Sequence, residues 1–307
     1  MSKQIIALYL VTLTFAVCVS AQQGPPADAA ALLKQAQQLE SDGKRQEALG
    51  LFRGIVAKDP ANAAAHLGIG RVLNIEGQYD EARQHFQKAI DAASPSELNG
   101  ALSSMAISYA FEGKAADAAK YYQRLIDRHL ASGAADSAGG AANGLGRVYL
   151  ETGDTAAAEK WYRTGYETAS KNPKRTPAQI DLTEMRWHHA QARIAARRKQ
   201  FDVARKHVDE VRALVAAGRL DEAQRAQYPH VAGYVAFYAG ESDTAIAELS
   251  KADQEDPFIL SLLAQAYEQK RDVARARELY TKILAIPDHS LQAAFARPLA
   301  ARRLAAR

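Results

Sequence analysis

The sequence contains very little cysteine. Cys18 is the single one, and it lies in an apolar segment at the N-terminus. If that segment is removed, the mature chain has no thiol, which excludes disulfide bonds, thiolate metal sites and cysteine nucleophiles. Runs of β-branched residues are nearly absent after residue 20, so strands are not expected. Packing alone must then stabilise the mature chain.

The chain also lacks a marked excess of either charge. Its 39 lysines and arginines nearly balance 35 acidic residues, for a net charge of +4, whereas polyanion-binding proteins usually carry a denser basic patch. Hydrophobic residues make up 48% of the chain, enough for a large core, and the abundant alanine is the best helix former. Composition therefore predicts an all-α protein without a nucleic-acid partner.

Residues 1–21 have the pattern of a secretory signal peptide. Lys3 supplies a basic start, residues 5–19 are apolar, and Val19-Ser20-Ala21 provides the small residues that signal peptidase reads. We expect cleavage after Ala21, a flexible mature N-terminus at 22–28, and a periplasmic or secreted protein. The alternative is an uncleaved N-terminal membrane anchor, although the apolar stretch is shorter than the ~20 residues that span a bilayer. No other segment is apolar enough to span one.

A pattern recurs along residues 29–287. Each copy has a glycine or a substitute, an alanine five residues later, and an aromatic or large apolar residue four residues after that, as in 43–60 and 240–257. Upstream of several copies stands a small residue followed by a tyrosine three positions later, as in Ala106 and Tyr109. The alanines that anchor the copies are Ala48, Ala82, Ala118, Ala158, Ala204, Ala245 and Ala276.

This pattern resembles the tetratricopeptide repeat, whose period of about 34 residues equals the spacing of Ala48 and Ala82. The resemblance implies an all-α, right-handed α-solenoid, in which small residues let two helices approach closely and aromatic residues fill the space between units. We expect seven units of two antiparallel helices each. They are residues 29–62, 63–98, 99–133, 139–172, 176–216, 226–256 and 257–287.

Two segments lie outside the regular pattern. Residues 132–140 are rich in Ser, Gly and Ala, and we interpret them as a relaxed loop, with a hinge as the alternative. Residues 288–307 place Leu291, Phe295 and Leu299 at helical spacing among several arginines. We expect a capping helix with a basic tail over the last unit, because a solenoid needs its end covered. A basic interaction element is the alternative.

Patterns of catalytic and metal-binding residues are missing. His188 and His189 are adjacent, so on a helix they point about 100° apart and cannot chelate one metal together. The sequence has no HExxH, no GxSxG and no Gly-rich phosphate loop. We therefore expect no metal, no cofactor and no enzymatic activity. A helical cell-wall-associated enzyme, or a subunit of an enzyme complex, is the alternative, but the repeats leave no room for a catalytic domain.

The resemblance also implies a concave groove lined by the first helix of each unit. Carried onto this chain, the groove positions include Arg71, Asn74, Asn143, Arg147, His189, Arg193, Arg197, His230, Tyr234 and Phe237. Asn can bond a peptide backbone as donor and acceptor, and Arg can grip a carboxylate with two bonds. We therefore expect a protein or peptide partner, acidic or with a free carboxylate. Alternatively, these arginines merely solvate the wall.

The lysines by which chaperone-binding members of that family clamp their ligands are missing, so the resemblance does not extend to chaperone binding. Taken together, the sequence predicts a non-catalytic protein–protein interaction scaffold of the cell envelope.

Overall fold

The structure is a computed structural model that describes residues 27–306. The predicted signal peptide and its cleavage site lie outside the described residues. The first helix begins at Ala27, so the last two residues of the segment 22–28, which we expected to be flexible, are helical. Across the described range the chain forms helices and no strand, which confirms the all-α solenoid.

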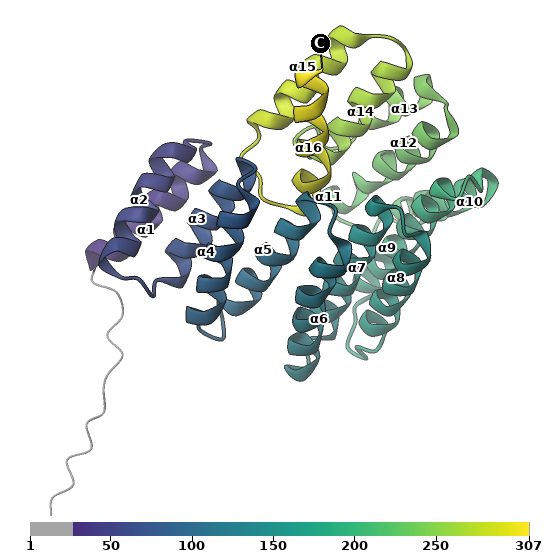
Figure 1. The fold of residues 1–307 in the computed structure, drawn as a ribbon. Coiled ribbons are helices and arrows are strands. Elements are labelled where there is room, and N and C mark those ends of the chain that lie inside the picture. Colours follow the sequence, from purple (N-terminus) through teal and green to yellow (C-terminus); the bar gives the residue numbers. More distant parts are fainter. Residues whose placement is uncertain (1–26, 307) are drawn as a thin grey trace, which may run out of the picture.

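The helices pack in pairs that follow the order of the chain (Figure 1). The pairs are α1 (Ala27–Ser41) with α2 (Arg45–Lys58), α3 (Ala63–Ile75) with α4 (Tyr79–Ala92), α5 (Leu98–Phe111) with α6 (Ala115–Ala131), α7 (Ala135–Thr152) with α8 (Thr155–Ser170), α9 (Pro177–Arg197) with α10 (Phe201–Ala216), α12 (Gln227–Ala239) with α13 (Ser242–Leu249), and α14 (Pro257–Gln269) with α15 (Val273–Ala285). The short helix α11 (Glu222–Arg225) precedes α12, and α16 (Leu291–Ala305) ends the chain.

The turn within a pair needs a residue in the left-handed conformation. Gly153 supplies it between α7 and α8 with φ +100°, a conformation that glycine adopts without steric cost. Lys199 and Arg271 stand where the repeat pattern lacks glycine, and they adopt the same conformation with φ 60° and 63°. The turn geometry is therefore kept in these two units, at a strain of about 1 kcal/mol each.

Small residues allow the close helix contacts that the repeat pattern requires. A Cβ atom added to Gly70 of α3 would lie 2.4 Å from the ring of Phe86 in α4, so a larger residue cannot occupy this position. The anchoring alanines are all buried, from Ala48, which has no exposed surface, to Ala276 at 1%. Close packing of this kind makes neighbouring units one continuous core.

The Ser/Gly/Ala-rich segment 132–140 is mostly helix, which corrects the loop interpretation. Residues 132–134 connect α6 to α7, and the rest form the first turns of α7. Gly139 faces α8 there, because an added Cβ would lie 2.7 Å from the carbonyl oxygen of Gly165. Gly139 thus permits a close helix contact rather than backbone freedom.

The C-terminal helix does more than cover the last unit, which corrects the expectation of a simple cap. It packs against α14 and α15, and also against α5 and α7 from the first half of the chain. Figure 1 shows α16, in yellow, between α5 and α14. Ala293 and Ala294 are buried in the core of the N-terminal units, and Phe295 contacts both that core and the core of α9–α14.

Candidate binding site in the concave face

A cavity of about 670 Å³ lies where α7, α9, α12 and the first turn of α16 meet. Asn143 and Arg147 line it from α7, and His189 and Arg193 line it from α9. The two residues of each pair are four positions apart on their helix, so each pair shares a helix face. The other lining residues are Gly140, Gly144, Tyr162, Leu182, Met185, Arg186, Asp221, Ala223, Gln224, Gln227, His230, Asp256, Leu291 and Gln292.

Two of the three arginines that line this cavity have very different partners. Arg193 is 5% exposed, and it donates to the hydroxyl of Tyr162 at 2.7 Å, with Glu151 at 3.9 Å. Arg147 lies over the ring of Phe258, with 4.7 Å from its Cζ to the ring centroid. Among the described residues, the buried Nε and Nη2 of Arg147 have no hydrogen-bond acceptor. A buried cation without an acceptor costs stability, so Arg147 is suited to bind an anion.

Two buried imidazoles stand beside the arginines. His189 and His230 have ring centroids 5.1 Å apart, and within the described part of the chain neither Nε2 atom finds a hydrogen-bond partner. Burial lowers the pKa of both side chains well below the usual value, and the nearby cations Arg193 and Arg147 lower it further. Both rings are therefore neutral near pH 7, and each can donate one hydrogen bond to a bound oxygen.

Each of the two carboxylates at the cavity uses one oxygen to cap a helix. Asp256 accepts from the backbone N–H of Phe258 at 2.7 Å as the N-cap of α14, and burial raises its pKa. Asp221 caps α11 through the N–H of Gln224 at 2.8 Å. Their acceptor atoms are used at least in part by these caps, whereas Arg147 keeps its donors free.

The first turn of α16 adds a further positive contribution. Ser290 caps this helix by accepting from the N–H of Ala293 at 3.2 Å, and the next two residues, Leu291 and Gln292, form a wall of the cavity. The N-terminal end of a helix carries a partial positive charge. The cavity therefore combines that dipole with the three arginines that line it.

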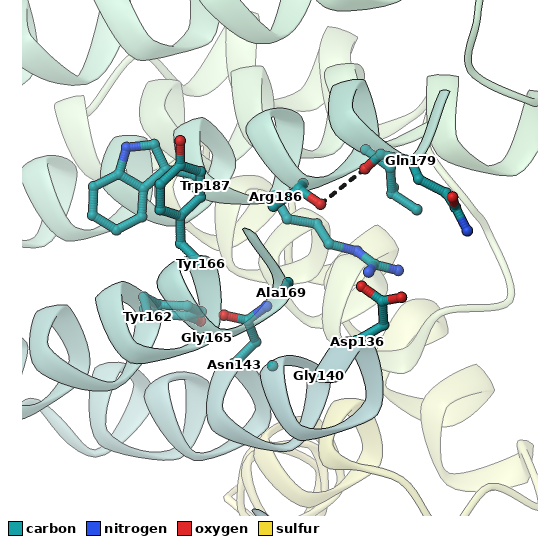
Figure 2. Close-up of a pocket in the computed structure, with 13 residues that line it drawn as sticks. Asp136, Gly140, Asn143, Tyr162, Gly165, Tyr166, Ala169, Gln179, Arg186 and Trp187 are labelled. Atoms are coloured by element: carbon teal, nitrogen blue, oxygen red, sulfur yellow. Dashed lines mark hydrogen bonds between the residues drawn. The ribbon is translucent and has the colours of Figure 1, made fainter. Parts of the chain in front are cut away.

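A smaller chamber of about 140 Å³ adjoins the cavity between α7, α8 and α9 (Figure 2). The two spaces share Gly140, Asn143, Tyr162, Leu182 and Arg186 as lining residues. Aromatic rings of Tyr166 and Trp187 form one side of the chamber, and Figure 2 shows Arg186 extending from α9 toward Asp136. The chamber is large enough for one apolar or aromatic group, since a cavity of about 150 Å³ can hold benzene.

These side chains provide hydrogen-bond donors for a bound group. Donors that are buried without acceptors are satisfied by an ordered water, an ion or a ligand. Within residues 27–306, no group of three or more His, Cys, Asp and Glu is arranged to hold a metal ion. In the same range, no helix has the length and apolarity needed to cross a membrane.

Comparison with known proteins identifies the repeat. A family model described as the tetratricopeptide repeat matches residues 33–97, 104–173 and 230–290, which together exceed half of the chain. The chain belongs to the tetratricopeptide repeat family. No curated protein matches the chain in sequence.

Solved structures show the same fold at low sequence identity. A tetratricopeptide repeat protein from Parabacteroides merdae shares 14% identity with a TM-score of 0.55, and the match covers 91% of this chain and 98% of that one. The tetratricopeptide-like repeats of a putative kinesin light chain from Podosopora anserina share 18% identity with a TM-score of 0.52, covering 64% of this chain and 99% of theirs. At such identities the likeness shows the fold alone.

The structure brings half of the predicted groove residues together and separates the rest. Asn143, Arg147, His189, Arg193 and His230 all line the cavity. Arg197 lies beside it, where it pairs with Glu151 at 3.2 Å and donates to Tyr238.

The remaining predicted groove residues of this tetratricopeptide repeat protein have structural partners or no exposed surface. Arg71 pairs with Glu40 through two hydrogen bonds of 2.6 and 2.5 Å. Asn74 and Tyr234 have no exposed surface, and Phe237 packs against the core of α9–α14. Asn74 and Tyr234 therefore cannot touch a guest in this structure, which corrects their placement on the groove wall.

Several cavity residues were missed by sequence reasoning. Arg186 lies one helical turn before His189 and Ala190, so extending the helix face of His189 and Arg193 by one turn could also have found it. Leu291 and Gln292 carry no comparable signal. They reach the cavity because the curvature of the preceding units brings α16 back to α7.

Proposed function

We propose that this tetratricopeptide repeat protein is a non-catalytic interaction scaffold of the cell envelope, periplasmic or secreted after cleavage behind Ala21. Its partner is a protein that inserts an acidic or carboxylate-bearing peptide segment into the concave cavity. The family supports a protein partner in general, since such repeats generally serve as non-enzymatic interaction modules. The pattern of residues 1–21 supports the location.

The observation that carries the proposal is the guanidinium group of Arg147. It lies in the concave cavity with two buried nitrogen atoms that lack acceptors among the described residues. Because both nitrogen atoms are buried in this structure, the guanidinium group must turn toward the cavity to meet a guest. A carboxylate would then supply both acceptors at once, because the planar guanidinium fork matches its two oxygens. Arg193 and the two neutral imidazoles line the same cavity.

Affinity capture from an envelope extract tests the proposal. The bait is the full chain, beside an Arg147→Met variant, which keeps side-chain length but removes the charge. Arg212→Met is the matched control, because Arg212 is exposed on α10 and pairs only with Asp209 of its own helix at 2.7 Å. We expect specific partners that Arg147→Met loses and Arg212→Met retains. Equal capture by all three baits would exclude the cavity as the binding site.

The location is tested by fractionation and N-terminal sequencing of the recovered chain. We expect a soluble envelope fraction in which the protein begins at Gln22. Recovery from the cytoplasm with Met1 intact would contradict the export that we propose. Recovery of the uncleaved chain with the membrane would instead support an N-terminal anchor.

A further inference from the structure

Two pairs of histidines that do not line the concave cavity share one geometry. In the α3–α4 pair, the Nδ1 atoms of His66 and His85 are 2.8 Å apart. In the α9–α10 pair, those of His188 and His207 are 2.9 Å apart. The ring centroids are separated by 5.0 and 5.2 Å, and the ring planes are inclined by 43° and 42°. The chain therefore builds the same arrangement of two imidazoles twice.

The two pairs occupy the same positions of the repeat. In each pair the second histidine follows the first by 19 residues and stands three residues after the anchoring alanine, Ala82 or Ala204. In the third unit the corresponding positions hold Leu102 and Tyr121. A helix pair of this protein therefore folds without histidines at these positions, and the fold alone does not explain why two units carry both.

A backbone contact orients the α3–α4 pair. Nε2 of His66 lies 3.0 Å from the carbonyl oxygen of Pro60, and because a carbonyl oxygen only accepts, this nitrogen carries the proton. Nδ1 of His66 therefore has a lone pair, to which Nδ1–H of His85 donates. Histidines that bind metal ions are commonly oriented in the same way, by donating from the other ring nitrogen to a carbonyl oxygen.

The spacing of the Nδ1 atoms suits a metal ion as well as a hydrogen bond. Bonds between a metal ion and imidazole are about 2.0–2.1 Å long. Two such bonds at a right angle hold their nitrogen atoms about 2.8–3.0 Å apart, whereas a tetrahedral angle requires about 3.3–3.4 Å. The observed 2.8 and 2.9 Å match the right angle, and this is the geometry of square-planar and tetragonal Cu²⁺ sites.

We propose that each of the two histidine pairs binds a divalent transition-metal ion, Cu²⁺ most tightly, through its two Nδ1 atoms. Among the divalent ions of the first row, Cu²⁺ has the highest affinity for such ligands. As the ion enters the α3–α4 pair, the proton of His85 moves from Nδ1 to Nε2, so both rings stay neutral. His85, His188 and His207 are partly exposed, so water reaches the ion and completes its coordination.

Charges of both signs lie near the two pairs. Near His85, the carboxylate of Glu81 offsets part of the positive charge of Lys88 and Arg53. Near His207, the carboxylate of Glu210 on the same helix favours a positive charge. These surroundings therefore allow a cation at both pairs.

The buried histidines of the concave cavity differ in this respect. His189 and His230 share the cavity with the cations Arg147 and Arg193, which oppose a further positive charge. Among the described residues, neither Nε2 atom of these histidines has a partner within hydrogen-bond distance. We therefore assign the metal ions to the α3–α4 and α9–α10 pairs alone, and the cavity remains open to a guest.

Titration of the untagged full chain with Cu²⁺ tests the proposal, with Cys18→Ser in every protein so that no thiol competes. Isothermal titration calorimetry should show two ions per chain. His85→Gln and His207→Gln should each remove one ion, because glutamine can donate a hydrogen bond to the first histidine but removes the second imidazole ligand. The double variant should bind none with comparable affinity. His129→Gln, which removes a histidine outside both pairs, should still bind two.

Electron paramagnetic resonance identifies the ligands. In the unchanged pairs, each Cu²⁺ ion should give an axial spectrum with two imidazole nitrogen atoms in the equatorial plane. Cu²⁺ should also raise the midpoint of thermal unfolding, because it binds the folded chain and joins two helices. These two measurements need no substitution in either pair, so they hold even if a variant folds poorly.

Three results would overturn the proposal. One is a number of bound ions that stays the same in His85→Gln and His207→Gln, and another is a spectrum with fewer than two imidazole nitrogen atoms per ion. The third is an unfolding midpoint that does not rise with Cu²⁺. The two pairs would then serve only as hydrogen bonds within their helix pairs.

Discussion

The imidazole of His289 stacks on the ring of Phe111, with the two planes inclined by 19°. This contact joins the loop before the last helix to the end of α5, far away in the sequence. It lies where the two ends of the solenoid meet, beside Phe86 and close to Arg71. Because this imidazole is buried, the contact of the C-terminal segment with α4 and α5 is sensitive to pH.

Acid should weaken the fold through His289. Burial, with a smaller effect of Arg71, lowers its pKa from the usual 6.5 to about 3. The unfolded chain therefore binds a proton below about pH 6.5 that the folded chain does not take up until about pH 3. The stability that the neutral ring contributes is complete above pH 6.5 and falls as the pH drops toward 3.

Urea unfolding at pH 7 and pH 5 measures this effect. His289→Phe keeps an aromatic ring in the same place but cannot be protonated. Its free energy of unfolding should therefore fall by about 2 kcal/mol less than that of the wild type over this interval. Other buried histidines, such as His189 and His230, contribute to the pH dependence of both proteins and cancel in the comparison. An identical loss in the two proteins would show that His289 does not titrate as described.

Removal of the charge at Arg147 should stabilise the protein. Its guanidinium is partly desolvated, lies over Phe258, and lacks an ion-pair partner among the described residues. Arg147→Met replaces it with an apolar chain of similar length, and we expect a gain of about 1 kcal/mol in the free energy of unfolding. Chemical denaturation in the absence of ligand measures it. A loss of stability would mean that Arg147 serves the fold rather than a guest.

The neighbouring glycines 139 and 140 provide a matched pair within α7. Gly139→Ala would place a methyl group against the backbone of Gly165, so we expect a loss of about 2 kcal/mol. No atom lies within 4 Å of the Cβ position of Gly140, so Gly140→Ala should gain about 1 kcal/mol from helix propensity. Thermal unfolding of both variants distinguishes helix from loop, since two near-neutral substitutions would restore the loop interpretation that the structure corrects.

The sequence carries much of the fold because its signals are local. Glycine, alanine and aromatic residues at fixed offsets predict each helix pair, and even Lys199 and Arg271 are recognisable as substitutes for the turn glycine. The face shared by His189 and Arg193 follows from helical spacing in the same way. Composition misled us at residues 132–140, because small residues in a helix contact look like those in a loop.

The packing of α16 against α5 could not be predicted in this way. Whether α16 reaches α5 depends on small rotations added over all units, which no short pattern encodes. The same curvature decides that Asn74 is buried while Asn143 faces a cavity, although both occupy groove positions in their units. Sequence reasoning therefore identified residues of the C-terminal half of the groove, but not Leu291 and Gln292 of α16, which form a wall of the cavity.

The most direct test of the account is the state of the Arg147 guanidinium when a peptide binds. Nuclear magnetic resonance of the full chain with ¹⁵N-labelled arginine resolves the Nε–H groups, and the Arg147 signal is the one missing from Arg147→Met. Adding an acidic peptide from a captured partner should shift that signal, and the same peptide with its carboxylates replaced by amides should not. Binding of the acidic peptide with the Arg147 signal unchanged would contradict the account.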